Sequence, residues 1–317
     1  MPLDSPCHRV YPIVSMTQSR PLWGAFTALV TPFTSDGCNV DGDALEALVS
    51  YQIEQCIDGL VPCGTTGESP TLSDDERRDI ITRTVKIAAG RVPVVAGTGS
   101  NDTKKSLRTS QEALELGADA VMIVMPYYNK PSQEGMFRHV TTIATQIGGA
   151  PVVVYNIPGR SVVDLSTDTL ARIVDAAPNV VAVKDATGNV QRCQEVVRRF
   201  GGSVAVLSGD DALTLPMMAC GAKGVISVTS NVYPRRVASM CLAMRVGDLD
   251  SARSLHYGLL PVHEAMFVEP SPVPVKTALA MQQRIQFAVR LPMVPPTEAT
   301  RNLIEKTLNA YDALDLS

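Results

Sequence analysis

Residues 179–184 read Asn-Val-Val-Ala-Val-Lys, an apolar run that ends in a charged residue. A run that is apolar at every position is typical of a strand buried on both faces, as in a parallel sheet covered by helices. Seven further short apolar runs occur along the chain, and they are Ala25–Val30, Gly59–Pro62, Val92–Ala96, Ala120–Val124, Pro151–Tyr155, Val204–Leu207 and Gly224–Val228. Together these runs predict eight parallel strands.

Amphipathic segments separate the apolar runs. One of them places apolar residues at helical spacing, at Leu45, Leu48, Val49 and Ile53. Ser73–Glu76 has the pattern of a capping box, and Asp102 and Ser132 stand where later helices are expected to begin. Eight strand–helix units over roughly 220 residues favour an α/β fold closed into a (β/α)8 (TIM) barrel over an open doubly wound sheet.

The pattern changes after Gly247, where the strands cease. Three helical segments are expected beyond it, at Asp250–Phe267, Pro274–Phe287 and Glu298–Leu314. We therefore expect a loosely ordered N-terminal extension (1–22), a barrel (23–247) and a C-terminal helical region (248–317).

Composition limits the classes of function. The chain has 317 residues, 45% of them hydrophobic, and a formal net charge of −4, which argues against a nucleic-acid or anionic-membrane surface. No apolar stretch approaches the roughly 18–20 residues of a membrane helix, and no secretory signal is evident. Seven cysteines form no Cys-x-x-Cys pair, which indicates reduced thiols. The expected location is the cytoplasm.

Barrel enzymes place their active sites at the carboxyl ends of the strands, where Lys184 and Tyr155 end two neighbouring runs. Burial would favour the neutral amine of Lys184, which is a nucleophile towards a carbonyl carbon and can form a Schiff base. The phenol of Tyr155 can donate and accept the protons of that reaction. Taken alone, Lys184 could be a solvated lysine that ends a strand, and Tyr155 could be a tyrosine packed in the core. The pairing of the two residues favours a catalytic role.

Other strand ends offer groups that could bind a substrate. Thr65 and Thr66 follow a glycine, and their hydroxyl and N–H groups could hold a carboxylate and pass protons to Tyr155, although many such turns are purely structural. Arg160 offers a planar fork for a second carboxylate, or else a rim ion pair. Asp210-Asp211 is expected to cap the next helix rather than bind a metal.

Neither a metal nor a nucleotide cofactor is expected. None of the four histidines falls at a strand end, which counts against a metal site and against histidine acid–base catalysis. Gly97-Thr98-Gly99 lacks the third glycine of a dinucleotide fingerprint, which excludes a nicotinamide oxidoreductase.

Seven motifs occur in one order over roughly residues 23–313, and as a set they are highly specific. They are Gly64–Glu68 (Gly-Thr-Thr-Gly-Glu), Pro126–Ser132, Tyr155–Arg160 (Tyr-Asn-Ile-Pro-Gly-Arg), Lys184–Gly188, Ser208–Ala212, Gly224–Asn231 and Glu269–Lys276. The chain thereby resembles the dihydrodipicolinate synthase family, which belongs to the pyruvate-dependent class I aldolase-like barrels.

The resemblance implies a lyase (EC 4.3.3.7) that works without a cofactor. Pyruvate would condense with Lys184, the resulting enamine would attack the aldehyde of L-aspartate-β-semialdehyde, and cyclisation would release 4-hydroxy-tetrahydrodipicolinate, the entry step of lysine biosynthesis through diaminopimelate. It also implies roles for further residues: Tyr155 as proton donor and acceptor, Thr65 and Tyr128 as the proton relay, and Thr66, Arg160, Ile226 and Gly209 as substrate contacts.

Family members use the equivalent of Tyr128 in the neighbouring subunit's site. The resemblance therefore implies a homo-oligomer, expected to be a tetramer built from dimers, with no nucleic-acid or membrane partner.

Related enzymes on the same fold are the main alternative, namely N-acetylneuraminate or 2-keto-3-deoxy-sugar-acid lyases. Arg160 favours the synthase, since neuraminate lyases usually have leucine there. A catalytically silent keto-acid sensor would not need both Lys184 and Tyr155.

The chain departs from the family pattern at Ser161-Val162, in residues 1–22, and at Arg77 and Lys105. Lysine-inhibited members carry a histidine and a glutamate at those last two places. Two added positive charges predict weak or absent feedback by lysine.

Overall fold

The structure is a computed structural model that describes residues 22–314. The expected N-terminal extension, residues 1–22, lies outside the described residues except for Leu22. Within residues 22–314, no helix is both long enough and apolar enough to cross a membrane.

Eight parallel strands form the centre of the fold, as predicted. They are β1 (Gly24–Ala28), β2 (Gly59–Val61), β3 (Val95–Gly97), β4 (Ala120–Val124), β5 (Val152–Asn156), β6 (Val180–Asp185), β7 (Ala205–Ser208) and β8 (Gly224–Ser227). Their order is β2-β1-β8-β7-β6-β5-β4-β3. The ends of this sheet meet where Leu60 N–H donates to Pro93 O (3.0 Å) and Gly97 N–H donates to Pro62 O (2.9 Å), so the sheet closes into a barrel.

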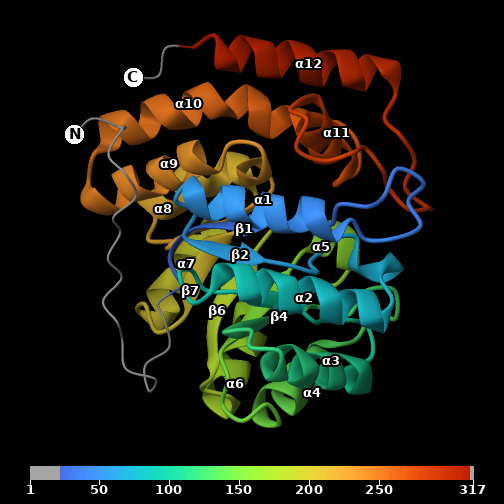
Figure 1. Cartoon of the computed structure of the whole chain (residues 1–317). Coiled ribbons are helices and arrows are strands. Elements are labelled where there is room, and N and C mark those ends of the chain that lie inside the picture. The colour runs from blue at the N-terminus through green and yellow to red at the C-terminus, as the bar shows by residue number, and fades with distance from the viewer. Residues whose placement is uncertain (1–21, 315–317) are drawn as a thin grey trace.

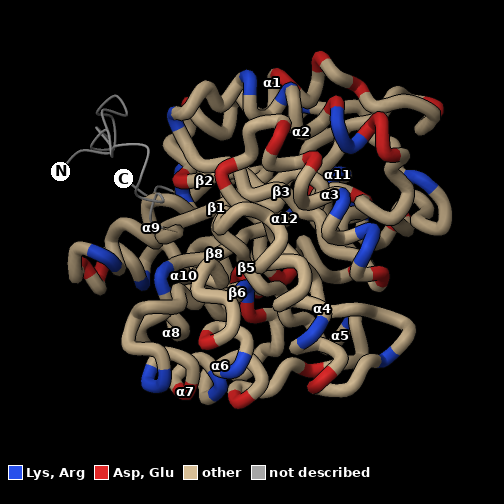
Figure 2. The backbone as a smooth tube through the Cα atoms, turned by 90° about the horizontal axis from the view of Figure 1, so that it is seen from below, with Lys and Arg blue, Asp and Glu red and all other residues tan. Residues whose placement is uncertain are grey.

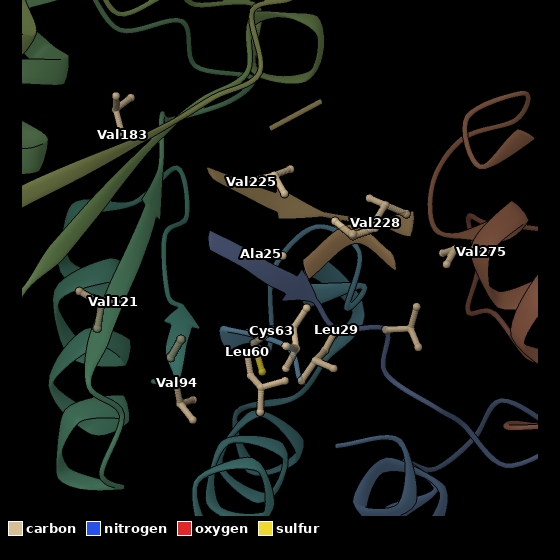
Figure 3. Close-up of a cluster of buried hydrophobic side chains, with 14 of the residues drawn as sticks. Ala25, Leu29, Leu60, Cys63, Val94, Val121, Val183, Val225, Val228 and Val275 are labelled. Atoms are coloured by element: carbon tan, nitrogen blue, oxygen red, sulfur yellow. The ribbon is translucent and has the colours of Figure 1, made fainter. Parts of the chain in front are cut away.

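The side chains of each strand alternate between two apolar layers because successive residues of a strand point to opposite faces. On β5, Val153 and Tyr155 belong to the cluster inside the barrel, whereas Val152 and Val154 belong to the larger cluster between the strands and the helices. Figure 3 shows part of the outer cluster. Both faces of the strands are therefore buried, which is why the runs are apolar at every position.

Helices surround the barrel (Figure 1). They are α1 (Gly42–Glu54), α2 (Asp74–Ala88), α3 (Thr103–Glu115), α4 (Gln133–Thr145), α5 (Pro158–Ser161), α6 (Thr167–Ala176), α7 (Val190–Phe200), α8 (Thr214–Ala219) and α9 (Pro234–Val246), with short 3-10 turns η1 (Ser69–Thr71), η2 (Asp211–Leu213) and η3 (Thr229–Asn231). The predicted start signals are confirmed: Ser73 and Glu76 form a capping box, and Asp102 and Ser132 are N-caps.

Three further helices follow the barrel: α10 (Leu249–Ala265), α11 (Val273–Met281) and α12 (Glu298–Asp312). In Figure 1, α12 runs alongside α10 on one side of the molecule, and Figure 3 shows Val275 of α11 on the side of its helix nearest Val228. The second helix ends six residues earlier than the predicted Phe287 because Gln283 has a left-handed backbone (φ 55°).

Charged residues of both signs are spread over the outside of the fold, as Figure 2 shows. Five cysteines, at 38, 63, 193, 220 and 241, carry free thiols.

Candidate active site

Lys184 and Tyr155 lie side by side inside the barrel. They are paired in the register of β5 and β6, so both side chains point to the same face of the sheet. The ammonium nitrogen of Lys184 lies 4.2 Å from the centroid of the Tyr155 ring. Lys184 was expected at the end of the strand, and β6 continues one residue further, through Asp185, so the lysine lies within the barrel wall. The two side chains are only 5% and 4% exposed.

Burial shifts the protonation of both groups towards the neutral form. It lowers the pKa of Lys184 to about 8, a shift that the charge of Asp211 opposes and that of Arg160 reinforces. Burial raises the pKa of Tyr155 to about 12, against the opposing effects of Arg160 and of a hydrogen bond with Thr65. Near neutral pH, the site therefore holds a partly neutral amine beside a protonated phenol.

The turn after β2 carries Thr65 and Thr66 to the same end of the barrel. Gly67 N–H donates to Gly64 O (3.1 Å) and Glu68 N–H donates to Thr65 O (3.1 Å), which folds the turn tightly. Thr66 is buried, and Thr65 is partly exposed and bonded to the Tyr155 phenol. The predicted approach of Thr65 to Tyr155 is thus present in the structure.

Arg160 lies on the short helix α5, directly after β5, where its charge acts on both Lys184 and Tyr155. Its Nη2 donates to the carbonyl of Ser271 (3.3 Å), so the C-terminal region helps to orient it. Val162 ends this helix with a left-handed backbone (φ 68°), a conformation that is strained for a β-branched residue.

Gly209 directly follows β7, and Ile226 is the next-to-last residue of β8. A Cβ atom on Gly209 would lie 2.6 Å from the Cβ of Ala186, so only glycine fits beside the end of β6. Gly209 N–H donates to Asp185 O (2.7 Å), which ties these two strand ends together. Ile226 is buried in the same interior cluster as Tyr155.

A polar network behind Lys184 was not predicted from the sequence. The carboxylate of Asp185 accepts hydrogen bonds from the Thr187 hydroxyl (2.6 Å) and from Arg192 Nε (3.1 Å). Asn156 at the end of β5 donates to Asp164 (2.7 Å), which lies 3.9 Å from Arg192. The network holds the ends of β5 and β6 in place. Its only signal in the sequence is that Asp185 and Asn156 directly follow the paired residues.

Asp210 and Asp211 have different roles, so the capping prediction is right for one of them. Asp210 accepts from Ala212 N–H (3.0 Å) at the start of η2. Asp211 instead accepts from the Ser227 hydroxyl and from Val228 N–H (2.9 Å), at the end of the neighbouring strand β8. It is buried, and its negative charge acts on Lys184.

Tyr128 is not brought to Lys184 within one chain. Its side chain is 87% exposed, and its backbone is left-handed (φ 72°). The structure leaves this predicted relay residue on the outside of the barrel.

The two positions singled out for lysine feedback differ in environment. Arg77 is buried and donates to the carbonyls of Gly97 (3.4 Å) and Ser69 (3.3 Å), whereas Lys105 is exposed.

Among the described residues, no group of three His, Cys, Asp or Glu side chains is placed to hold a metal ion.

The chain is similar to known proteins over nearly its whole length. Residues 21–311 match the dihydrodipicolinate synthetase family. A 4-hydroxy-tetrahydrodipicolinate synthase of Sorangium cellulosum is 59% identical, over 92% of this chain and 97% of that protein. The crystal structure of dihydrodipicolinate synthase from Aquifex aeolicus superposes with a TM-score of 0.89 at 43% identity, and it covers 92% of this chain and 98% of its own. The structure of the 4-hydroxy-tetrahydrodipicolinate synthase of Methylacidiphilum fumariolicum SolV superposes with a TM-score of 0.90 at 43% identity. The match covers 92% of this chain and 96% of that one.

Proposed function

The chain belongs to the dihydrodipicolinate synthetase family, and from that premise we propose that it condenses pyruvate with L-aspartate-β-semialdehyde to 4-hydroxy-tetrahydrodipicolinate through a Schiff base on Lys184. The observation that carries the assignment of the lysine is its pairing with Tyr155 inside the barrel. The reaction is that of a lyase in the diaminopimelate route to lysine.

The first step is attack of the neutral Lys184 amine on the keto carbon of pyruvate. With a pKa of about 8, close to a tenth of the amine is neutral at pH 7, several hundred times more than for an ordinary lysine. The carbinolamine loses water, and the Tyr155 phenol donates the proton that leaves with the hydroxyl group. The product is an iminium ion on Lys184.

The iminium then acts as the electron sink, so the chemistry needs no cofactor. Loss of a proton from the pyruvate methyl group gives an enamine, whose carbon attacks the aldehyde carbon of the semialdehyde. The aldehyde oxygen takes up a proton. The amine of the semialdehyde then attacks the iminium carbon, which releases the Lys184 amine and closes the ring. Thr65 is bonded to Tyr155 and relays these protons.

Arg160 and Thr66 supply the two carboxylate contacts of the proposal. Thr66, buried in the turn after β2, would hold the carboxylate of pyruvate together with the backbone at Gly209 and Ile226. Arg160 would bind the carboxylate of the semialdehyde. The sugar-acid lyases are not favoured, because the relatives and the solved structures are named as synthases.

Tyr128 is proposed to complete the site of a second copy of the chain. Its side chain is 87% exposed, as expected for a residue that serves a neighbouring subunit. We propose a homo-oligomer, a tetramer built from dimers, in which Tyr128 extends the relay of the partner. Co-expression of Lys184→Arg with Tyr128→Phe tests this: mixed dimers contain one complete site and should restore up to about a quarter of the original activity. No gain over the two inactive variants alone would contradict the exchange.

A direct assay tests the proposed reaction. Pyruvate consumption with L-aspartate-β-semialdehyde is compared with pyruvate release from N-acetylneuraminate and from 2-keto-3-deoxy-sugar acids. We expect pyruvate to be consumed in the presence of the semialdehyde, and we expect no release of pyruvate from the sugar acids. Preferential cleavage of a sugar acid would reassign the enzyme to the lyases.

A further inference from the structure

A buried ion pair connects the turn after β2 with α11, across 208 residues of sequence. The Nζ atom of Lys276 lies 2.5 Å from Oε1 of Glu68, and the lysine side chain is fully buried. The ammonium also donates to Ala288 O (2.7 Å) and lies 4.1 Å from the centroid of the Phe33 ring. Its three N–H groups thus have a carboxylate, a carbonyl and an aromatic face as partners.

The second oxygen of Glu68 is held by the segment 288–290, which we call the C-terminal strap. Arg290 N–H donates to Glu68 Oε2 (3.0 Å). The Arg290 guanidinium binds both carboxylate oxygens of Glu76 and the carbonyl of Thr71, both of which follow the turn in the chain. Through these hydrogen bonds, the strap fixes the segment from Glu68 to the first turn of α2.

Glu68 itself belongs to the turn that carries the two threonines. Its backbone is left-handed (φ 55°), a conformation that costs a non-glycine residue about 1 kcal/mol or more. Its N–H is bonded to Thr65 O, and its carbonyl accepts from Thr71 N–H (3.0 Å). A displacement of the Glu68 carboxylate would therefore be transmitted to Thr65, which contacts Tyr155.

Stability alone is a weak explanation for such a pair. Removing two charges from water is costly, and well-packed apolar residues often replace a buried ion pair without loss of stability. An apolar pair would lack the directional, charge-assisted hydrogen bonds that hold each carboxylate oxygen of Glu68. The geometry that the pair imposes on the turn is the better explanation.

We propose that Lys276 and the C-terminal strap, acting through Glu68, are positioning residues that hold Thr65 and Thr66 in register with Lys184 and Tyr155. In this proposal, the C-terminal region contributes to catalysis although Lys276, the strap and Glu68 make no contact with substrate. This inference rests on the proposed function.

The double variant Glu68→Gln, Lys276→Met tests the proposal because it removes both charges and leaves neither one unpaired. Misplacement of reacting groups by about 1 Å costs up to roughly a hundredfold in rate, so we expect kcat to fall ten- to a hundredfold and KM for pyruvate to rise about tenfold. Borohydride should still label Lys184 at saturating pyruvate. Glu112→Gln is the matched control: it removes a carboxylate that binds Arg78 and Arg108 on the outside of α2 and α3, away from the strap and the turn, and both constants should stay within about twofold.

Kinetic constants of the folded double variant within twofold of the original would overturn the proposal. If the double variant does not fold, Glu68→Asp replaces it, since it keeps the charge and shortens the side chain by one methylene. The same losses are expected, and unchanged constants would again overturn the inference. Absence of the Lys184 adduct in the unsubstituted protein would instead refute the proposed function.

Discussion

Raising the pH from 7 to 9 is expected to accelerate Schiff-base formation about tenfold and then have no further effect. In the proposed mechanism, only the neutral amine of Lys184 attacks pyruvate. With a pKa of about 8, the neutral fraction is about 9% at pH 7, 50% at pH 8 and 91% at pH 9. The phenol of Tyr155, with a pKa of about 12, stays protonated throughout this range. The lysine therefore accounts for the whole rise.

The assay is the initial rate of imine formation at subsaturating pyruvate, measured between pH 6 and 10 by borohydride trapping. Two variants provide controls of opposite sign. Arg160→Met removes a charge that lowers the Lys184 pKa, so the midpoint should move up, and Asp211→Asn removes a charge that raises it, so the midpoint should move down. A rate that still rises tenfold per pH unit above pH 9 would refute the argument, because it would mean that the pKa of the lysine is close to its ordinary value.

Three substitutions have expected effects on stability. Lys184→Met should abolish turnover. Because it removes a buried charge, it should also raise the free energy of unfolding at pH 7, measured in urea titrations, by about 1–3 kcal/mol. A loss of stability would contradict the assigned burial of the lysine. Val162→Gly should stabilise the protein by about 1 kcal/mol by relieving a left-handed backbone, and an unchanged midpoint would argue against strain there. Gly209→Ala should destabilise it by about 1–3 kcal/mol and lower kcat, since its Cβ would lie 2.6 Å from that of Ala186; full activity would mean that the strand ends can separate freely. Lysine feedback is expected to be weak, and strong inhibition of turnover by submillimolar L-lysine would contradict that prediction.

The barrel could be predicted because its strands are buried on both faces. Continuous apolar runs such as Ala120–Val124 leave a signal that needs no knowledge of tertiary contacts, and this strand has the predicted bounds. The helix starts were equally accessible, since the capping box at Ser73 and Glu76 is a local contact. Strand ends that depend on pairing with a neighbouring strand differ from the predicted ends by one to three residues, as at the end of β6 and the start of β3.

The pairing of Lys184 with Tyr155 could be inferred from the sequence because parallel strands align their carboxyl ends. Contacts between residues far apart in the sequence could not be inferred in this way. The bond from Arg160 to Ser271, the pair of Glu68 with Lys276 and the turn of Asp211 towards Ser227 depend on packing of the C-terminal region and of β8. Periodicity along the chain carries no information about such contacts.

The central claim is that pyruvate forms a Schiff base with Lys184, and one measurement tests it most directly. The protein is incubated with pyruvate and borohydride, digested, and the adduct is located by peptide mass. We expect one pyruvate-derived adduct per chain, on the peptide that contains Lys184, and none in the folded Lys184→Arg variant. An adduct on another lysine, or no adduct at all, would contradict the mechanism.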